Sequence, residues 1–190
     1  MYTRDCNPLK IAQIKVNAKA GKLGICICPG IKDTSSLANR QDRDLEQDVQ
    51  TIASWQAKAA LTLMDTKELE RFGVANIGEV MTRHQIQWYH FPIQDMCIPD
   101  KRIKDTWSEI SADLCSTIIC GGNVLIHCRG GLGRSGMIAA RILVELGWDP
   151  EPAIQKVREV RPGAIETTDQ ESFVFAASVS GNRKHLWHYF

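Results

Sequence analysis

The sequence predicts an α/β fold with a mainly parallel central sheet flanked by helices on both faces. Short apolar segments typical of buried strands alternate along the chain with segments of helical periodicity. The chain has 190 residues and 44% hydrophobic residues, which is enough to bury a core without disulfide or metal staples. We therefore expect a single domain over 1–190, with its core at about 10–180 and an irregular tail over 181–190.

The first half of the chain sets up this alternation. An apolar strand over 22–28 closes at a Pro-Gly turn. A helix is expected over 43–56, because apolar side chains recur there at helical spacing: Leu45, Val49, Ile52 and Trp55. A short strand over 60–64 precedes two short helices over 67–72 and 76–85, and Asp65 or Thr66 can cap the first of them.

The second half repeats the pattern. A strand over 87–93 stops near Pro92, and a helix over 101–119 follows it. The apolar strand 123–128 runs into a glycine-rich segment. Three helices complete the predicted fold: 137–146, Pro150 or Pro152 to Val160, and Thr167 or Thr168 to about Val179.

Charge and cysteine content exclude several classes of partner. Lys+Arg 23 against Asp+Glu 22 gives a net charge of +1, which favours neither nucleic acid nor an anionic membrane surface. The chain has no apolar run long enough for a spanning helix and no signal-peptide pattern, so we expect no membrane insertion and a cytoplasmic location. The seven cysteines contain no C-x-x-C pair, so we expect free and mostly buried thiols and no metal site.

The segment from His127 to Gly136, HCRGGLGRSG, carries the strongest chemical signal. It follows a strand and opens a helix, where free backbone N–H groups and the helix dipole bind anions. That environment favours the thiolate of Cys128, and the planar fork of Arg134 suits phosphate. We expect the phosphate-binding residues to be Arg129, Gly130, Gly131, Leu132, Gly133 and Arg134.

The C-x5-R pattern followed by serine resembles the signature of the cysteine-dependent protein tyrosine phosphatase superfamily. Four segments are similar to the kinase-associated phosphatase group of dual-specificity phosphatases, and the likeness covers roughly 10–180: LGICICPGIKD, FPIQDMCIPD, HCRGGLGRSG and RPGAIETTDQ. The resemblance implies a compact phosphatase fold that hydrolyses phosphoamino acids through a phosphocysteine without a metal or other cofactor. It also implies a phosphoprotein partner and leaves a kinase open as that partner.

The resemblance also assigns roles to single residues. Cys128 is expected as the nucleophile, Arg134 as the phosphate clamp and Asp95 as the general acid. Ser135 is expected to stabilise the leaving thiolate when the phosphocysteine is hydrolysed. Gln170 is expected to place the attacking water or only to hold the loop.

Some residues remain open to two interpretations. Asp100 lies in the same loop as Asp95 and could be the acid, although it could instead cap the next helix. His127 is expected to bond buried loop backbone rather than serve Cys128 as a base, because adjacent strand residues face opposite sides. Arg158 and Arg161 are candidates for support of the crevice or ordinary surface arginines. Cys97 could pair with Cys128 as a resolving thiol, but the sequence gives no distance.

Arg129 keeps a second function class open. A basic residue directly after the nucleophile could favour a more anionic substrate, as in phosphoinositide phosphatases, or could be a solvated arginine at the rim. The alternatives to a protein phosphatase are therefore a lipid phosphatase and a non-catalytic phospho-binding module. A sulfurtransferase fits less well, because its loop resembles C-x4-R and is one residue shorter.

Overall fold

The computed structural model describes residues 8–34, 41–100 and 104–179. Its centre is a sheet of five strands in the order β1-β2-β7-β5-β6. In chain order these strands are β1 (Ala12–Lys15), β2 (Lys22–Cys26), β5 (Ala57–Thr62), β6 (Gln87–His90) and β7 (Asn123–His127). All neighbouring pairs are parallel except β1 and β2. The predicted mainly parallel sheet is therefore confirmed.

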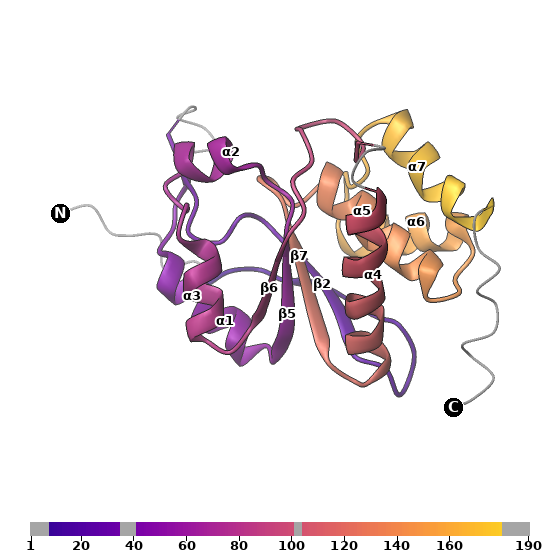
Figure 1. The fold of residues 1–190 in the computed structure, drawn as a ribbon, viewed down its shortest axis with the longest axis horizontal. Coiled ribbons are helices and arrows are strands. Elements are labelled where there is room, and N and C mark those ends of the chain that lie inside the picture. Colours follow the sequence, from indigo (N-terminus) through magenta and orange to yellow (C-terminus); the bar gives the residue numbers. More distant parts are fainter. Residues whose placement is uncertain (1–7, 35–40, 101–103, 180–190) are drawn as a thin grey trace.

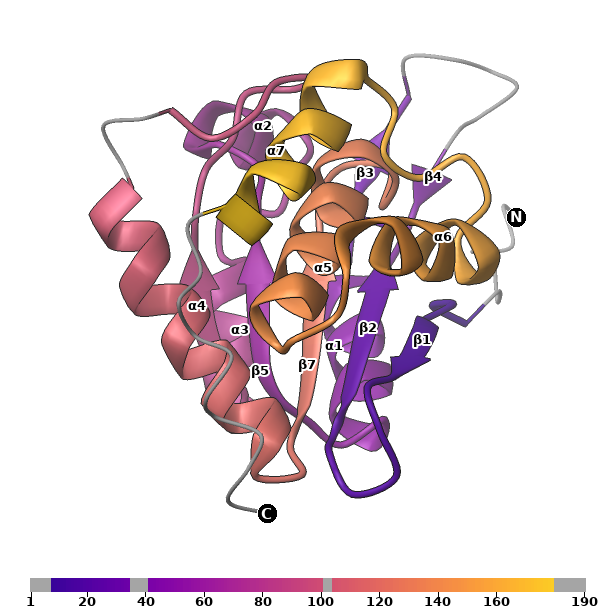
Figure 2. The ribbon, with the colours of Figure 1, turned by 90° about the vertical axis from the view of Figure 1, so that its right-hand side faces the viewer.

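Helices cover both faces of this sheet, as the alternating pattern predicted (Figure 1). On one face lie α1 (Leu45–Ser54), α2 (Thr66–Arg71) and α3 (Ile77–Arg83). On the other face lie α4 (Lys104–Ile119) and α5 (Gly133–Glu145). The last two helices, α6 (Pro150–Val160) and α7 (Thr168–Val179), pack mainly against α5, and α6 also contacts the edge strand β1 (Figure 2).

The strand sequences are continuous apolar runs because both faces of the sheet are buried. In β7, Val124 and Ile126 belong to the hydrophobic core beneath α4 and α5. Leu125, which points to the opposite face, belongs to the second core beneath α1 and α3. Such a two-sided core fixes the register of the strand and thus the position of Cys128, the residue that follows it.

Some predicted boundaries are wrong. The helix predicted at 137–146 begins at Gly133, because the Gly-Arg-Ser-Gly turn is already helical although its residues are not apolar. The strand at 12–15 and the short hairpin of β3 (Lys32–Asp33) and β4 (Gln41–Asp42) were not expected. Both are edge or two-residue strands, which have weak sequence patterns.

The predicted cap of α2 is confirmed as Asp65, which forms a capping box with Glu68. The helix predicted from 101 is described only from Lys104, so the N–H groups that Asp100 was expected to cap, at 101–103, lie outside the described residues. In the described part of the chain, no helix has the length and apolarity needed to cross a membrane.

The four parallel strands end in register. Cys26 of β2 pairs with His127 of β7, His127 with Thr62 of β5, and Thr62 with His90 of β6. The loops that follow these strands therefore start from one edge of the sheet. This is the edge at which ligands bind in open α/β folds, and it is where the sequence placed the crevice.

Candidate active site

The glycine-rich segment forms a tight loop between β7 and α5. The left-handed φ of +66° at Gly131 requires glycine, and a Cβ there would collide with the carbonyl oxygen of Cys26 at the end of β2. Gly136 lies against Ala164, where a Cβ would approach within 2.9 Å of the alanine side chain. The loop is thus held closely by its neighbours, and the first N–H groups of α5 have no partner within the helix and can bind an anion.

Cys128 and Ser135 meet at this loop. The sulfur of Cys128 lies 3.4 Å from the hydroxyl oxygen of Ser135, which is in the first turn of α5. Both side chains are buried. The hydroxyl can therefore donate to the sulfur when the sulfur carries negative charge.

Arg134 is the most completely buried charge of the described chain, with 1% of its side chain exposed. Its two terminal nitrogens donate to Glu68 at 2.6 and 3.0 Å, and one of them also donates to the carbonyl oxygen of Ile93 at 3.0 Å. Burial opposes the charge, but the hydrogen bonds to Glu68 and the nearby Cys128, Glu68 and Asp95 together raise the pKa of Arg134 above its usual value. The Nε of Arg134 has no hydrogen-bond partner among the described residues.

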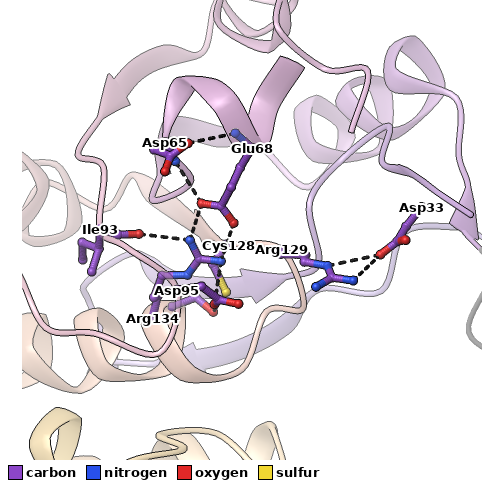
Figure 3. A network of polar contacts seen from close by, with 9 residues as sticks. Asp33, Asp65, Glu68, Ile93, Asp95, Cys128, Arg129 and Arg134 are labelled. Atoms are coloured by element: carbon purple, nitrogen blue, oxygen red, sulfur yellow. Dashed lines mark hydrogen bonds and ion pairs between the residues drawn. The ribbon is translucent and has the colours of Figure 1, made fainter. Parts of the chain in front are cut away.

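Glu68 is a site residue that the sequence reasoning missed. It reaches Arg134 from α2, on the opposite side of the loop from α5 (Figure 3). Its Oε2 also accepts the backbone N–H of Asp65 at 3.1 Å, and its own N–H donates to the Asp65 carboxylate at 2.8 Å. The D-x-x-E spacing after a strand was the available signal, because it indicated a capping box that holds this carboxylate in place.

Asp95 lies beside the guanidinium of Arg134. Its carboxylate is 2.9 Å from an Nη of Arg134, and 56% of the side chain is exposed. The strand-end loop that carries it is anchored where the Ile93 N–H donates to the carbonyl oxygen of Leu63 at 3.0 Å. An acid at the rim and a thiol at the base of one loop is the arrangement that the sequence predicted.

Arg129 occupies a different environment from Arg134. Its Nε and Nη2 donate to one oxygen of Asp33 at 3.2 and 2.6 Å, and its guanidinium lies 5.0 Å from the ring centroid of Phe72. Figure 3 shows this side chain extended toward Asp33 and away from Cys128. The interpretation as a merely solvated arginine is wrong, because the side chain is ion-paired.

Two arginines from α6 and its end bond backbone near the site, Arg161 at the catalytic loop and Arg158 at the turn before α7. Arg161 donates to the carbonyl oxygens of Gly131 and Gly130, both at 2.9 Å. Arg158 donates to those of Ala164 and Ile165, both at 3.2 Å. Both arginines therefore contact backbone around the crevice rather than open solvent alone.

Gln170 is fully buried on α7 and lies against Gly133. Its Oε1 accepts the backbone N–H of Glu166 at 2.9 Å, while its Nε2 has no partner among the described residues. The carboxylate of Glu166 also contacts the Gly133 position, which the sequence reasoning did not single out. A buried amide donor thus lies beside the start of α5.

His127 is buried and faces the sheet rather than the crevice. Its Nε2 lies 2.8 Å from the hydroxyl oxygen of Thr62 on β5. Burial lowers the pKa of His127 to about 4. The ring is therefore neutral near pH 7. Cys97 is exposed and free.

Comparisons with known proteins place these features in a family. The family model described as Cyclin-dependent kinase inhibitor 3 (CDKN3) matches residues 4–154. Cyclin-dependent kinase inhibitor 3 of Rattus norvegicus is 32% identical over 155 residues, which cover 80% of this chain and 69% of the relative. Protein tyrosine phosphatase type IVA 3 of Homo sapiens is 29% identical over 111 residues, which cover 53% and 63% of the two chains.

A solved structure supports the same relationship. Kinase associated phosphatase (KAP), with its catalytic-site cysteine substituted by serine, matches with a TM-score of 0.78 and 28% identity. The match covers 90% of this chain and 94% of that chain.

Proposed function

The chain belongs to the Cyclin-dependent kinase inhibitor 3 (CDKN3) family, and from this premise we propose that Cys128, Arg134, Asp95 and Ser135 carry its chemistry. The chain is a cysteine-dependent protein phosphatase, as its relatives are. One observation carries the proposed assignment. Cys128 and Ser135 share the base of a loop whose rim holds Asp95 against the buried guanidinium of Arg134.

In the first step, the sulfur of Cys128 attacks the phosphorus of a bound phosphate monoester. The S–P bond forms as the bond between phosphorus and the side-chain oxygen breaks. The carboxyl group of Asp95 gives its proton to the departing oxygen, since its exposed position at the rim is reachable from the far side of the phosphate.

Arg134 holds the phosphate along the edge of its guanidinium that carries Nε. The Nε is unpartnered, and the Nη on the same edge contacts Asp95, which a bound phosphate oxygen replaces there. Both Nη atoms stay bound to Glu68, and the other one also donates to the Ile93 carbonyl oxygen, which fixes the plane of the group. Backbone N–H groups of residues 129–133 complete the phosphate cradle.

In the second step, water attacks the phosphocysteine and the thiolate leaves. The Ser135 hydroxyl, 3.4 Å from the sulfur, stabilises the negative charge that develops there. The side-chain amide of Gln170 lies beside Gly133, and its Nε2 has no partner among the described residues. We assign this amide to orienting the attacking water. Inorganic phosphate is then released and Cys128 is restored.

The substrate that we propose is a phosphorylated protein, with a protein kinase as the first candidate. The names of the relatives, Cyclin-dependent kinase inhibitor 3 and kinase associated phosphatase, support this choice. The lipid alternative needs Arg129 for an additional headgroup phosphate, and in this fold Asp33 already neutralises that arginine. We also propose a cytoplasmic location, because the six described cysteines are thiols rather than disulfides and a thiolate nucleophile needs a reducing compartment.

Turnover of para-nitrophenyl phosphate in the presence of a metal chelator tests the proposal. Cys128→Ser should abolish turnover and keep phosphate binding, because the loop is intact without its nucleophile. The matched control is Cys120→Ser, which changes an exposed cysteine outside the site. Turnover above a few per cent in Cys128→Ser would exclude the covalent route, and a wild-type chain that binds phosphopeptide without turnover would be a binding module.

A further inference from the structure

The contact between Arg129 and Asp33 joins two segments that are distant in sequence. Asp33 belongs to β3, outside the catalytic loop, and only 11% of its side chain is exposed. Arg129 is 41% exposed and gives both of its hydrogen bonds to a single oxygen of that carboxylate. Arg129, next to the nucleophile, is thus ion-paired with the carboxylate of Asp33, which plays no part in the proposed chemistry.

The fold places Asp33 for this contact. The backbone N–H of Lys32 donates to the carbonyl oxygen of Phe72 at 2.9 Å, which fixes β3 against the end of α2. The Phe72 ring in turn lies under the guanidinium of Arg129. The arginine is therefore held by a backbone-anchored carboxylate and an aromatic face together.

We propose that Asp33 is a specificity-determining residue that keeps the phosphatase selective for phosphopeptides with a single phosphate. It neutralises Arg129 and draws it away from Cys128, so that no free cation meets a second phosphate group on the same peptide. Removal of the Asp33 charge should free Arg129 to bind that second phosphate. This inference rests on the proposed function of the Cys128 loop.

The reach of the side chain decides which peptide suits the test. Two residues that are two positions apart in an extended peptide lie about 7 Å from each other. Arg129 directly follows the nucleophile, and its long side chain can span such a distance. A peptide phosphorylated at the target residue and again two positions away therefore presents its second phosphate within range of a released Arg129.

The experiment compares kcat/KM for two peptides of the same sequence, one with a single phosphate and one with the second phosphate two positions away. The readout is the ratio of the doubly to the singly phosphorylated peptide for each variant. Asp33→Asn should raise this ratio about 3- to 10-fold, as expected for one charge-assisted contact. Asp42→Asn is the matched control, because it removes an acidic charge from the same hairpin at a residue that pairs with Lys32.

Three outcomes decide the proposal. An unchanged ratio in an active Asp33→Asn variant overturns it. The gain must also disappear in the Asp33→Asn, Arg129→Gln double variant, because a merely structural effect of Asp33 would persist there. A gain confined to short-chain phosphoinositides with two phosphates would show that Arg129 meets lipid headgroups instead, and this too overturns the peptide proposal.

Two further measurements keep the inference testable on its own. If Asp33→Asn does not fold, Asp33→Ser replaces it. If neither folds, Arg129→Gln decides, because an arginine that is already neutralised should leave the wild-type ratio within about 2-fold. Failure of the proposed function would instead appear as turnover in Cys128→Ser, whatever the ratio in the Asp33 variants.

Discussion

The two arginines of the catalytic loop lie close in sequence and differ in almost every physical respect. Arg134 is buried, and Glu68, Asp95 and a backbone carbonyl surround it. Arg129 is partly exposed and is held by one carboxylate and one aromatic ring. A buried guanidinium needs nearly all of its donors satisfied, whereas a half-exposed one keeps water as an alternative partner.

This difference indicates that the acid contacts of the two arginines have different roles, one in stability and one in specificity. All three acid partners come from outside the loop: Glu68 from α2, Asp95 from the segment after β6 and Asp33 from β3. For Arg134, loss of its partner leaves an uncompensated buried charge, so the contact is part of the stable fold. For Arg129, the contact can be broken at little cost, so it can adjust specificity without endangering the fold.

After the loss of the nucleophile itself, the largest expected effect is that of Arg134→Lys. An ammonium group cannot supply two phosphate donors while it also bonds Glu68 and the Ile93 carbonyl, so kcat/KM should fall by about 10³–10⁵, as for arginines that stabilise phosphoryl transfer. Steady-state kinetics with para-nitrophenyl phosphate measures the loss. Arg129→Lys, the matched change at the other end of the loop, should lose far less. Equal losses would remove the distinction between the two arginines.

Asp95→Asn should be next in size. Without a proton donor, kcat should fall by about 10²–10⁴ and lose the decline at high pH that deprotonation of a general acid causes. The deficit should shrink with a leaving group of low pKa, which needs little protonation. Asp100→Asn serves as the control. A larger loss in the control variant than in Asp95→Asn would make Asp100 the acid.

Ser135→Ala tests the second step of the reaction, the hydrolysis of the phosphocysteine. Hydrolysis of the phosphocysteine should slow by about 10²-fold, the lower range for loss of one stabilising donor, while its formation changes less. Rapid-quench measurements should then show a burst of released alcohol followed by slow turnover. If both steps slow equally and no burst appears, Ser135 acts only in the structure of the first turn of α5.

Glu68→Gln tests how much the carboxylate that holds Arg134 contributes to stability and to turnover. Glutamine keeps an acceptor for Asp65 and Arg134 but removes the charge, so unfolding should become easier by about 1–3 kcal/mol. Turnover should fall about 10-fold because the guanidinium loses its fixed plane. Urea unfolding and steady-state kinetics measure the two effects. Glu70→Gln on the exposed side of the same helix is the control. An equal change in Glu70→Gln would show that the effect does not come from the contact between Glu68 and Arg134.

The sequence and the structure agree best where a pattern is local. Two features were predictable: the strand-loop-helix context of the Cys128 segment, and the apolar strands that end at one edge. Both depend on periodicity and glycine content, which are properties of residues adjacent in sequence. The early start of α5 was not, since the helix there begins with glycine, arginine and serine rather than apolar residues.

The partners of the two arginines were not predictable for a different reason. The capping spacing indicated how Glu68 is held but not that it meets Arg134, and Asp33 carries no signal that separates it from other acids of the chain. Their roles arise because the sheet order places the segment after β5, the β3 hairpin and the loop after β7 at one end of the molecule. Contacts of this kind depend on topology, which a single sequence specifies only indirectly.

The smallest expected effect is the stability change in Asp33→Asn. The ion pair that it removes is partly exposed, so the free energy of unfolding should fall by less than about 1 kcal/mol. Because salt screens such pairs, the difference between variant and wild type should shrink further at about 1 M salt, where the Debye length is about 3 Å. Glu68→Gln should keep most of its deficit under the same conditions, since water and ions reach the buried Arg134 poorly. Urea unfolding of both variants at low and high salt makes this comparison directly. A loss in Asp33→Asn that exceeds the loss in Glu68→Gln and resists salt would reverse the roles of the two arginines, because Arg129 would then be the one that holds the loop in place.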